Sequence, residues 1–264
     1  MNLISIYAPS SKLAFRDLNS INFFKKINNH FKVNLILDSK IDRNISKKFN
    51  NLFINKSNKF RNKLYLIHHQ LARVNYEKKH FPKYVDNQTL GLNSANLMLV
   101  KILHKAKLFK IVNFISSLIL EFTCSLDKNL MTNSKIFLAF GSAKDLLFDD
   151  LVRLAKKKGI KTILVTTNWD NATTKPYIEK PDMVWTWGKQ TADLSNRIHK
   201  ILSKPIGTPR YEIYNTISPS RSQSIKKLNL NKKFKYILYT GSSFPFIEDE
   251  IINRMYNYLK KNNL

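Results

Sequence analysis

Two apolar runs with an amphipathic segment between them constrain the fold of this chain more than any other feature. Residues 135–140 read KIFLAF and residues 161–167 read KTILVTT, and such nearly uninterrupted apolar runs are typical of strands that are covered on both faces. Between them, apolar residues recur at helical spacing up to Gly159, which suits the left-handed residue that follows a helix. The apolar positions of this helix are Leu146, Leu147, Leu151, Leu154 and Ala155. A strand, a helix and a strand in this order predict two parallel strands with a right-handed crossover.

The start of this central helix and the segments after it carry clear local signals. Ser142 is the expected N-cap, and Asp145 three residues later comes close to a capping box. Residues 183–187 (MVWTW) predict another short strand, residues 191–202 a helix, and residues 204–214 a loop.

The N-terminal part is uneven in its signals. Residues 2–7 and 32–37 predict strands, and residues 16–30 between them have apolar positions at helical spacing, so the chain begins with a βαβ pattern. We expect this first strand instead of a signal peptide, because no basic segment precedes a long apolar core. From about residue 40 to 130 the signals are weaker. There we expect a strand at 64–67 and helices at 92–106 and 108–121.

These elements predict an α/β fold, a Rossmann-like parallel sheet flanked by helices, over residues 1–217. Residues 218–233 are polar and resemble an interdomain linker in composition. Residues 235–243 and 247–261 then predict one strand, a Gly-containing turn and one helix. We interpret residues 234–264 as the start of a second, incomplete α/β domain.

Composition sets limits on the class of protein. The chain has 264 residues, enough for one large domain or two small ones, and its single cysteine, Cys124, excludes an intramolecular disulfide. The net charge of +27 comes from Lys and Arg residues spread along both halves, without a basic tail. A coding bias toward A and T explains such a composition, and attraction for an anionic surface, lipid or phosphorylated ligand is the second explanation.

Residues 97–120 contain the longest apolar segment. Several lysines interrupt it, and the uncharged run from Ile111 to Leu120 is shorter than the about 20 apolar residues that a membrane-spanning helix needs. The pattern fits either a basic helix that lies on an anionic membrane or a buried helix whose lysine stems reach solvent.

Polar residues follow the second apolar run. Residues 168–176 read NWDNATTKP, just outside the carboxyl end of a predicted strand, where open parallel sheets bind ligands. Asp170 must lie in a loop among donors or water, because an unpaired buried carboxylate is costly. Asn168 and Asn171 can donate and accept, which suits sugar hydroxyls, and Trp169 offers a flat apolar face to a sugar ring or base. The same residue types also form ordinary turns, caps and core contacts, so both interpretations stay open.

Three segments, in order, resemble the N-terminal half of bacterial glycosyltransferases of the GT-B type, in the branch of cell-surface polysaccharide enzymes. In that branch a WDN motif with Ser or Thr and Lys ends a strand, and a PD…VWG segment and a GTPRFD-like segment follow. The matching residues are Trp169, Asp170, Asn171, Thr173, Thr174 and Lys175; Pro181, Asp182, Trp187 and Gly188; and Gly207, Thr208, Pro209, Arg210 and Tyr211. Glu212 stands where the pattern has Asp. The resemblance covers about residues 135–243 and, weakly, residues 1–40.

The resemblance implies a two-domain enzyme whose N-terminal domain binds the acceptor and whose C-terminal domain binds a nucleotide sugar. It implies that Asp170 is the catalytic base or the group that grips the acceptor. The acceptor-binding residues that it implies are Asn168, Trp169, Asn171, Thr174, Lys175, Gly141 and Ser142. The donor-binding residues that it implies are Arg210 near the domain hinge and Gly241, Ser242 and Ser243 in a phosphate-side loop.

The expected partners are a nucleotide sugar and a glycan or lipid-linked acceptor. No cofactor and no metal is expected, because basic residues and helix termini can neutralise the leaving diphosphate. We expect a cytoplasmic protein at the inner face of the membrane, where lipid-linked acceptors are presented. The chain stops at Leu264, after one strand and one helix of the second domain, so we expect a truncated or split gene or a second polypeptide that supplies the rest.

Two alternatives belong to other classes of function. One is glycerol- or ribitol-phosphate transfer in wall-polymer synthesis, chemistry that uses a histidine base; His68, His69 and His104 stand in no recognisable motif. The other is a non-catalytic basic protein that binds a membrane surface or nucleic acid. No recognition motif with interleaved aromatic residues supports specific nucleic-acid binding.

Overall fold

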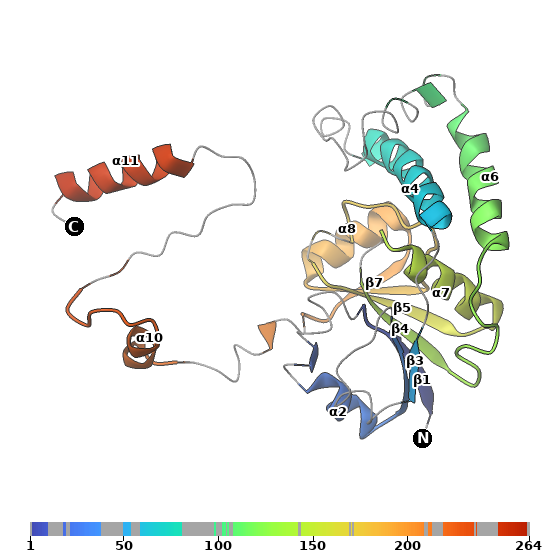
Figure 1. The fold of residues 1–264 in the computed structure, drawn as a ribbon, viewed down its shortest axis with the longest axis horizontal. Helices are drawn as coiled ribbons and strands as arrows, with labels where there is room; N and C mark the ends of the chain where they lie inside the picture. Colours follow the sequence, from blue (N-terminus) through green and yellow to red (C-terminus); the bar gives the residue numbers. More distant parts are fainter. Residues whose placement is uncertain are drawn as a thin grey trace. The chain divides into compact units, whose positions relative to one another are not determined.

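The fold is seen in a computed structural model (Figure 1). The described residues are 2–9, 18–19, 22–37, 50–53, 59–80, 98, 102–103, 105, 108–141, 144–168, 170, 172–208, 211–212, 219–234, 236 and 248–262. The chain divides into two compact units, Met1–Thr216 and Ile217–Leu264.

The first unit is built on a seven-stranded parallel sheet. The strand order is β3-β2-β1-β4-β5-β6-β7, and every neighbouring pair runs parallel. The strands are β1 (Leu3–Tyr7), β2 (Lys32–Leu37), β3 (Asn50–Phe53), β4 (Ile136–Gly141), β5 (Lys161–Thr166), β6 (Met183–Thr186) and β7 (Leu202–Pro205). This is the predicted α/β, Rossmann-like sheet, and the predicted strands at 2–7, 32–37, 135–140, 161–167 and 183–187 are confirmed.

Helices cover both faces of this sheet, as an all-parallel sheet requires. In the first unit they are α2 (Phe23–Asn28), α4 (Lys59–His80), α6 (Phe109–Phe122), α7 (Leu146–Lys157) and α8 (Lys189–His199). Helix α2 covers one face, where the rings of Phe23 and Phe140 meet edge to face with centroids 5.3 Å apart. Helix α7 covers the other face.

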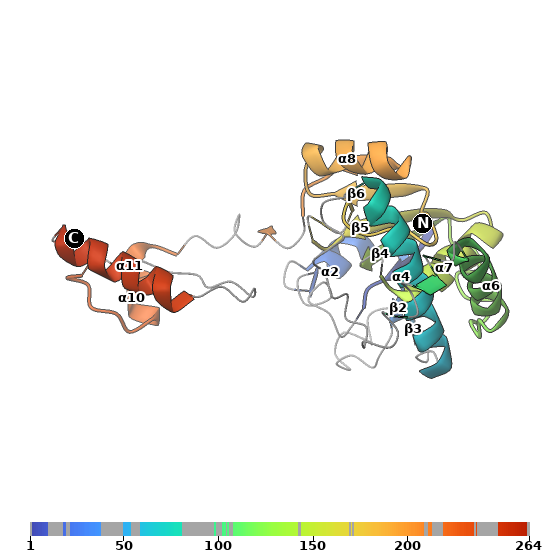
Figure 2. The same cartoon turned by 90° about the horizontal axis from the view of Figure 1, so that it is seen from above.

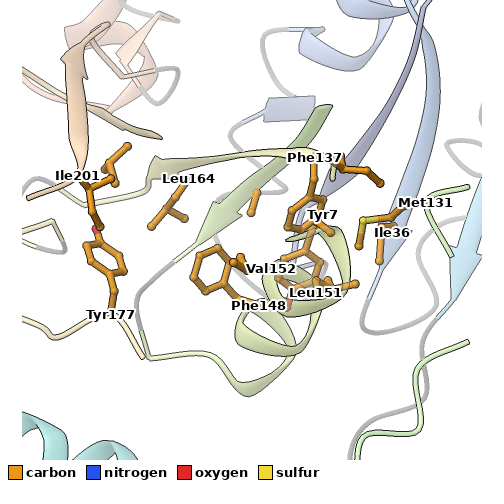
Figure 3. Packing of buried hydrophobic residues seen from close by; sticks show 14 of the residues in the cluster. Tyr7, Ile36, Met131, Phe137, Phe148, Leu151, Val152, Leu164, Tyr177 and Ile201 are labelled. Carbon is orange, nitrogen blue, oxygen red and sulfur yellow. The ribbon is translucent and has the colours of Figure 1, made fainter. Parts of the chain in front are cut away.

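The α7 face holds the larger core cluster. Phe148, Leu151 and Val152 of α7 point toward the sheet, where they meet Tyr7 of β1 and its neighbours Phe137 and Leu164 (Figure 3). Phe148, Leu151 and Val152 are fully buried. The apolar helical spacing in the sequence thus forms the face of α7 that packs on the sheet.

Helix α4 adds a layer outside α7, and α6 packs beside α4 on the outside of the unit (Figures 1 and 2). Arg61 of α4 is buried and joins three elements. Its Nη2 donates to the Leu120 carbonyl of α6 at 2.9 Å and to Asp150 Oδ1 of α7 at 3.0 Å, and its Nε donates to Thr123 Oγ1 at 3.1 Å. The outer layer is therefore fastened by a buried, charge-assisted network.

Three predictions of secondary structure were wrong in detail. Residues 64–67 lie inside α4 instead of in a strand, because a four-residue apolar run does not distinguish the two periods. The N-cap of α7 is Asp145, whose Oδ1 accepts from the backbone N–H groups of Leu147 and Phe148, so the helix begins later than a cap at Ser142 would place it. The predicted helix at 191–202 ends at His199, because Lys200 adopts a left-handed conformation (φ 54°).

The chain after α8 forms β7, a strand that the sequence did not predict. Strand β7 pairs with β6 and is the outermost strand of the sheet. Pro205 can be accommodated there because its missing N–H faces no neighbouring strand. The predicted helix at 108–121 is confirmed as α6. Most of the predicted helix at 92–106 lies outside the described residues.

The second unit contains two described helices, α10 (Arg221–Lys227) and α11 (Glu248–Lys261). The polar segment 218–233, which we interpret as a linker, includes α10 with a capping box between Ser220 and Gln223. The predicted strand at 235–243 lies almost wholly outside the described residues, and the predicted helix at 247–261 is confirmed as α11.

The Arg61 network yields a first prediction. Arg61→Met leaves Asp150 buried with only the longer ion pair to Arg153 at 3.5 Å, so we expect the free energy of unfolding to fall by roughly 3 kcal/mol in urea denaturation. The control is Lys189→Met, which removes an exposed ion pair to Asp193 and should cost less than about 1 kcal/mol. Equal losses in the two variants would contradict a stabilising role for the buried network.

Candidate functional site

The carboxyl ends of β4, β5, β6 and β7 lie side by side on one edge of the sheet. The strand order reverses between β1 and β4, and in open α/β sheets ligands bind outside the carboxyl ends next to such a reversal. The N-cap of α7 lies at this edge, where Asp145 Oδ2 accepts from the Tyr7 hydroxyl at 3.0 Å. The candidate site is this edge together with the loop of residues 167–182.

Side chains that follow β5, β6 and β7 contact one another at this edge. The indole N–H of Trp187, after β6, donates to the carbonyl of Thr166 at the end of β5 at 3.0 Å. The ring of Trp187 meets the ring of Tyr211, in the segment after β7, edge to face with centroids 5.3 Å apart. Thr167 Oγ1 donates to the Gly141 carbonyl of β4 at 3.4 Å. The residues just before the WDN motif, Trp187 of the VWG-like segment and Tyr211 therefore converge at one edge.

Asp170 organises a tight turn through its backbone. Its carbonyl accepts from the backbone N–H groups of Thr173 and Thr174 at 3.0 Å each, and from their hydroxyls at 3.2 and 2.9 Å. The side chain of Asp170 is half-buried, and Asn168 is exposed. Because a hydroxyl has one donor, the Thr174 hydroxyl can only accept from a ligand while it holds this turn.

The loop of residues 167–182 takes the place of a crossover helix between β5 and β6 and enters the core. Ala172, Thr173 and Tyr177 are buried, and Figure 3 shows Tyr177 facing Ile201 at one end of the core cluster. The loop thus has an exposed start at Asn168 and a fixed middle. A ligand at the edge would meet a turn whose position is set by the core.

Three aromatic side chains hold this middle part. The Tyr76 hydroxyl of α4 donates to the Thr173 carbonyl, and His199 Nε2 of α8 lies 3.0 Å from the Ala172 carbonyl. A carbonyl only accepts, so His199 carries a proton on Nε2. The Tyr76 and His199 rings stack with centroids 5.4 Å apart, and Tyr177 meets His199 edge to face at 4.6 Å.

Charged groups fix the end of the loop. Glu179 Oε1 accepts from Nε and Nη2 of Arg153 on α7 at 3.0 and 2.9 Å. Asp182 Oδ2 accepts from the backbone N–H and the hydroxyl of Thr162 at 2.7 and 2.8 Å. Thr162 lies near the amino end of β5, so Asp182 is at the edge of the sheet opposite to Asp170. The contacts of Asp182 hold the start of β6 against β5, so they explain the PD segment without a ligand.

Helix α4 places a buried histidine close to this edge. His69 is 1 % exposed, and neither ring nitrogen has a hydrogen-bond partner among the described residues. Burial lowers the pKa of His69 to about 3, and the positive charges of Lys144, Arg73 and Lys175 contribute to this decrease. His69 is therefore neutral at physiological pH, and Lys144 and Lys175 give this part of the edge a positive potential that favours anions.

A buried carboxyl group of α7, Asp149, contacts Tyr65, which lies one turn before His69 on α4. The Tyr65 hydroxyl donates to Asp149 Oδ2 at 2.7 Å, and the Glu179 N–H donates to Asp149 Oδ1 at 3.3 Å. Burial raises the pKa of Asp149 well above its usual range. The rings of Tyr65 and His69 lie with centroids 5.9 Å apart. The layer between α4 and α7 is thus polar behind the candidate site.

The predicted site residues fall into two groups. The structure brings Gly141, Asn168, Asp170, Thr174 and Lys175 to the same edge, the last four within one loop. Trp169, Asn171, Ser142, Arg210, Gly241, Ser242 and Ser243 lie outside the described residues. Among the part of the chain that is described, no group of three or more His, Cys, Asp or Glu side chains could hold a metal ion.

Sequence reasoning missed Tyr76, His199 and the position of His69. No local signal marks them, because the segment of α4 has weak periodicity and His199 stands among ordinary helical residues. A histidine and a tyrosine that are more than a hundred residues apart become partners only when α4 and α8 both contact the loop.

No protein-family model matches this chain, and no curated protein sequence matches it. The geometry of the edge and the resemblance of its three segments therefore carry the functional interpretation.

The buried histidines predict a pH dependence of stability. Burial lowers the pKa of His69 to about 3 and those of His68 and His199 to about 4, while the same side chains titrate near 6.5 in an unfolded chain. Between pH 6.5 and about 4 the unfolded chain binds protons that the folded chain does not. The free energy of unfolding should therefore decrease as the pH falls, by up to about 1.4 kcal/mol per histidine per pH unit.

The variant His69→Leu separates this effect from the buried carboxyl groups, whose raised pKa values act in the opposite direction. At neutral pH we expect a stability equal to or above that of the parent, because the described residues offer His69 no hydrogen bond to lose. In urea denaturation at falling pH, the variant should lose less stability than the parent. Parallel losses in both proteins would exclude His69 as a source of the pH dependence.

Tyr76 predicts a local effect on the candidate site. Tyr76→Phe keeps the ring on His199 but removes the donor to the buried Thr173 carbonyl, so we expect a loss of about 1–3 kcal/mol in the free energy of unfolding. Hydrogen exchange at the amides of Thr173 and Thr174 should accelerate more than exchange in β4. The exposed Tyr256→Phe is the control, and unchanged exchange in Tyr76→Phe would show that the loop does not depend on this contact.

Proposed function

We propose that this chain is the acceptor-side part of a glycosyltransferase that transfers a sugar from a nucleotide sugar to a cell-envelope glycan or a lipid-linked acceptor. One observation carries the proposal: at the carboxyl edge Trp187 of the VWG-like segment contacts Thr166, which lies three residues before Trp169, and Tyr211 of the GTPR-like segment. These residues are far apart in the sequence, and they lie at the edge where parallel sheets bind ligands.

The proposed chemistry starts at the acceptor hydroxyl. Asp170 accepts the proton of that hydroxyl as general base, and the hydroxyl oxygen forms a bond to the anomeric carbon of the donor sugar. The bond from that carbon to the diphosphate breaks, and the nucleoside diphosphate leaves with the bonding electrons. Asn168 orients acceptor hydroxyls, and the positive potential around Lys144 and Lys175 attracts the phosphate groups of donor or acceptor.

The remaining parts of the proposal concern residues that are not described. Trp169, Asn171 and Ser142 complete the acceptor site, and Arg210 with Gly241, Ser242 and Ser243 meets the donor diphosphate. We propose that the protein works at the inner face of the membrane, without a cofactor or a metal ion. Alditol-phosphate transfer by a histidine base has less support, since His68 and His69 are both buried away from solvent.

The test compares Asp170→Asn with the parent in a transfer assay. The full chain is incubated with a panel of radiolabelled nucleotide sugars and lipid-linked acceptors, and we expect kcat to fall by about 10²- to 10⁴-fold in the variant, with a small change in KM. Asp193→Asn, which removes an exposed carboxylate on α8, is the matched control and should keep the parent's activity.

Calorimetric titration of the acceptor is measured in parallel, because acceptor binding does not require the donor-binding half. Asn168→Ala should weaken acceptor binding. Transfer by Asp170→Asn at the parent's rate would remove Asp170 from the reaction, and acceptor binding that is equal in the parent and in both loop variants would remove the loop from the site.

A further inference from the structure

Helix α6 exposes a broad apolar face. At 100° per residue, six large apolar side chains fall within an arc of about 120°. These side chains, which we call the α6 apolar face, are Leu108 at the N-cap, Ile111, Phe114, Ile115, Leu118 and Phe122, all exposed. Phe114 is 65 % and Phe122 is 93 % exposed. A helix that only completes a core shows the opposite pattern.

The inner side of α6 carries few apolar side chains. Its two buried residues are Ser116 and Leu120, and the side-chain oxygen of Asn113 is buried without a hydrogen-bond partner among the described residues. Helix α6 packs against α4 along this inner side, and in both views it lies at the outside of the unit, away from the strands (Figures 1 and 2). The apolar face is therefore directed outward, where a contiguous apolar surface marks an interaction site.

A pocket of about 1040 Å³ continues this face toward α7. Leu118 and Phe122 of the apolar face line it together with Leu126 and Leu154, and the cationic side chains of Lys128, Arg153, Lys157 and Lys158 lie at the same pocket. Its two carboxylates are both paired, Glu121 with Lys157 at 2.6 Å and Asp150 with Arg61 at 3.0 Å. The surface thus combines an apolar stripe with an excess of positive charge.

We propose that the α6 apolar face docks on an anionic phospholipid bilayer. Apolar side chains would enter the boundary between headgroups and acyl chains. The exposed lysines near the two ends of the helix, Lys105 before it, Lys110 in its first turn and Lys128 after it, would meet the headgroup phosphates. Each lysine near an anionic leaflet adds to the electrostatic attraction. Among the described residues, no helix is long and apolar enough to cross a membrane.

Charge favours a lipid surface over a second copy of this chain. A symmetric dimer through α6 would place the lysines around this face opposite the same lysines of the partner, within a chain whose net charge is +27. An anionic bilayer has the opposite sign. The inference does not depend on the proposed transfer reaction, because vesicle binding needs neither donor nor acceptor.

The experiment measures co-sedimentation of the full chain with vesicles of phosphatidylglycerol and phosphatidylcholine in equal amounts, and with phosphatidylcholine alone. We expect binding to the anionic vesicles and at least tenfold weaker binding to the neutral ones. The double variant Phe114→Glu and Leu118→Glu should bind the anionic vesicles at least tenfold more weakly than the parent. Both side chains are exposed, so the variant should unfold at the parent's temperature.

A matched control changes exposed apolar residues of another described helix. Ile251→Glu and Ile252→Glu on α11 introduce the same charges and should leave vesicle binding within twofold of the parent. Cys124, the only cysteine, follows α6 and lines the pocket, so an environment-sensitive fluorophore attached there should shift to shorter wavelength with anionic vesicles.

Three outcomes would overturn the proposal. The first is equal binding of the parent and the α6 variant, which would leave only diffuse attraction by net charge. The second is loss of binding in the α11 variant alone. The third is a dimer in sedimentation equilibrium that the α6 variant dissociates while vesicles bind neither protein, which would assign the face to a second copy.

Discussion

Parallel backbone pairing along β4, β5, β6 and β7 is the constraint on which the other features depend. Because every pair runs in the same direction, all four carboxyl ends lie on one edge, and the segments after them become neighbours without any attraction of their own. The same pairing requires cover on both faces, which α2 and α7 supply. The position of the candidate site is thus a consequence of strand direction, and the polar residues lie at the edge where the carboxyl ends of the strands meet.

The loop between β5 and β6 shows how an irregular segment can be fixed as firmly as a helix. Few of its backbone groups are paired in a helix or strand, so other groups must satisfy its buried carbonyls. Tyr76 and His199 do so from two helices, and the Asp170 carbonyl organises its own turn. This arrangement gives the loop a rigid middle and an accessible start, which is suitable for a binding loop on a stable scaffold.

Two helices depart from the ordinary distribution of polar and apolar residues. Helix α4 buries His69, whose ring nitrogens have no partner in the described structure, and α6 exposes a continuous apolar face. Both departures cost stability. The buried imidazole of His69 loses its hydration, and the exposed apolar side chains of α6 stay in contact with water. In natural proteins such local inconsistencies concentrate where function requires them. His69 lies behind the carboxyl edge and the α6 apolar face lies on the outside of the unit, so they point to two separate functions.

The sequence by itself determined β1, β2, β4, β5 and β6, most of α7 and the chemical character of the loop after β5. Apolar runs of strand length, a helical spacing that ends at Gly159 and polar residues directly after a strand are local patterns, and local patterns can be read without knowing any contact. Gly141, Asn168, Asp170, Thr174 and Lys175 lie near one another because they belong to adjacent strands or to one loop.

Only the tertiary structure decided that residues 64–67 belong to a helix, that residues 202–205 form an edge strand, and that Tyr76 meets His199. In each case the deciding contacts join residues far apart in the chain: α4 on α7, β7 on β6, and α4 and α8 on one loop. The outward direction of the α6 apolar face was decided in the same way, because periodicity gives the width of an apolar stripe and packing decides which way it faces.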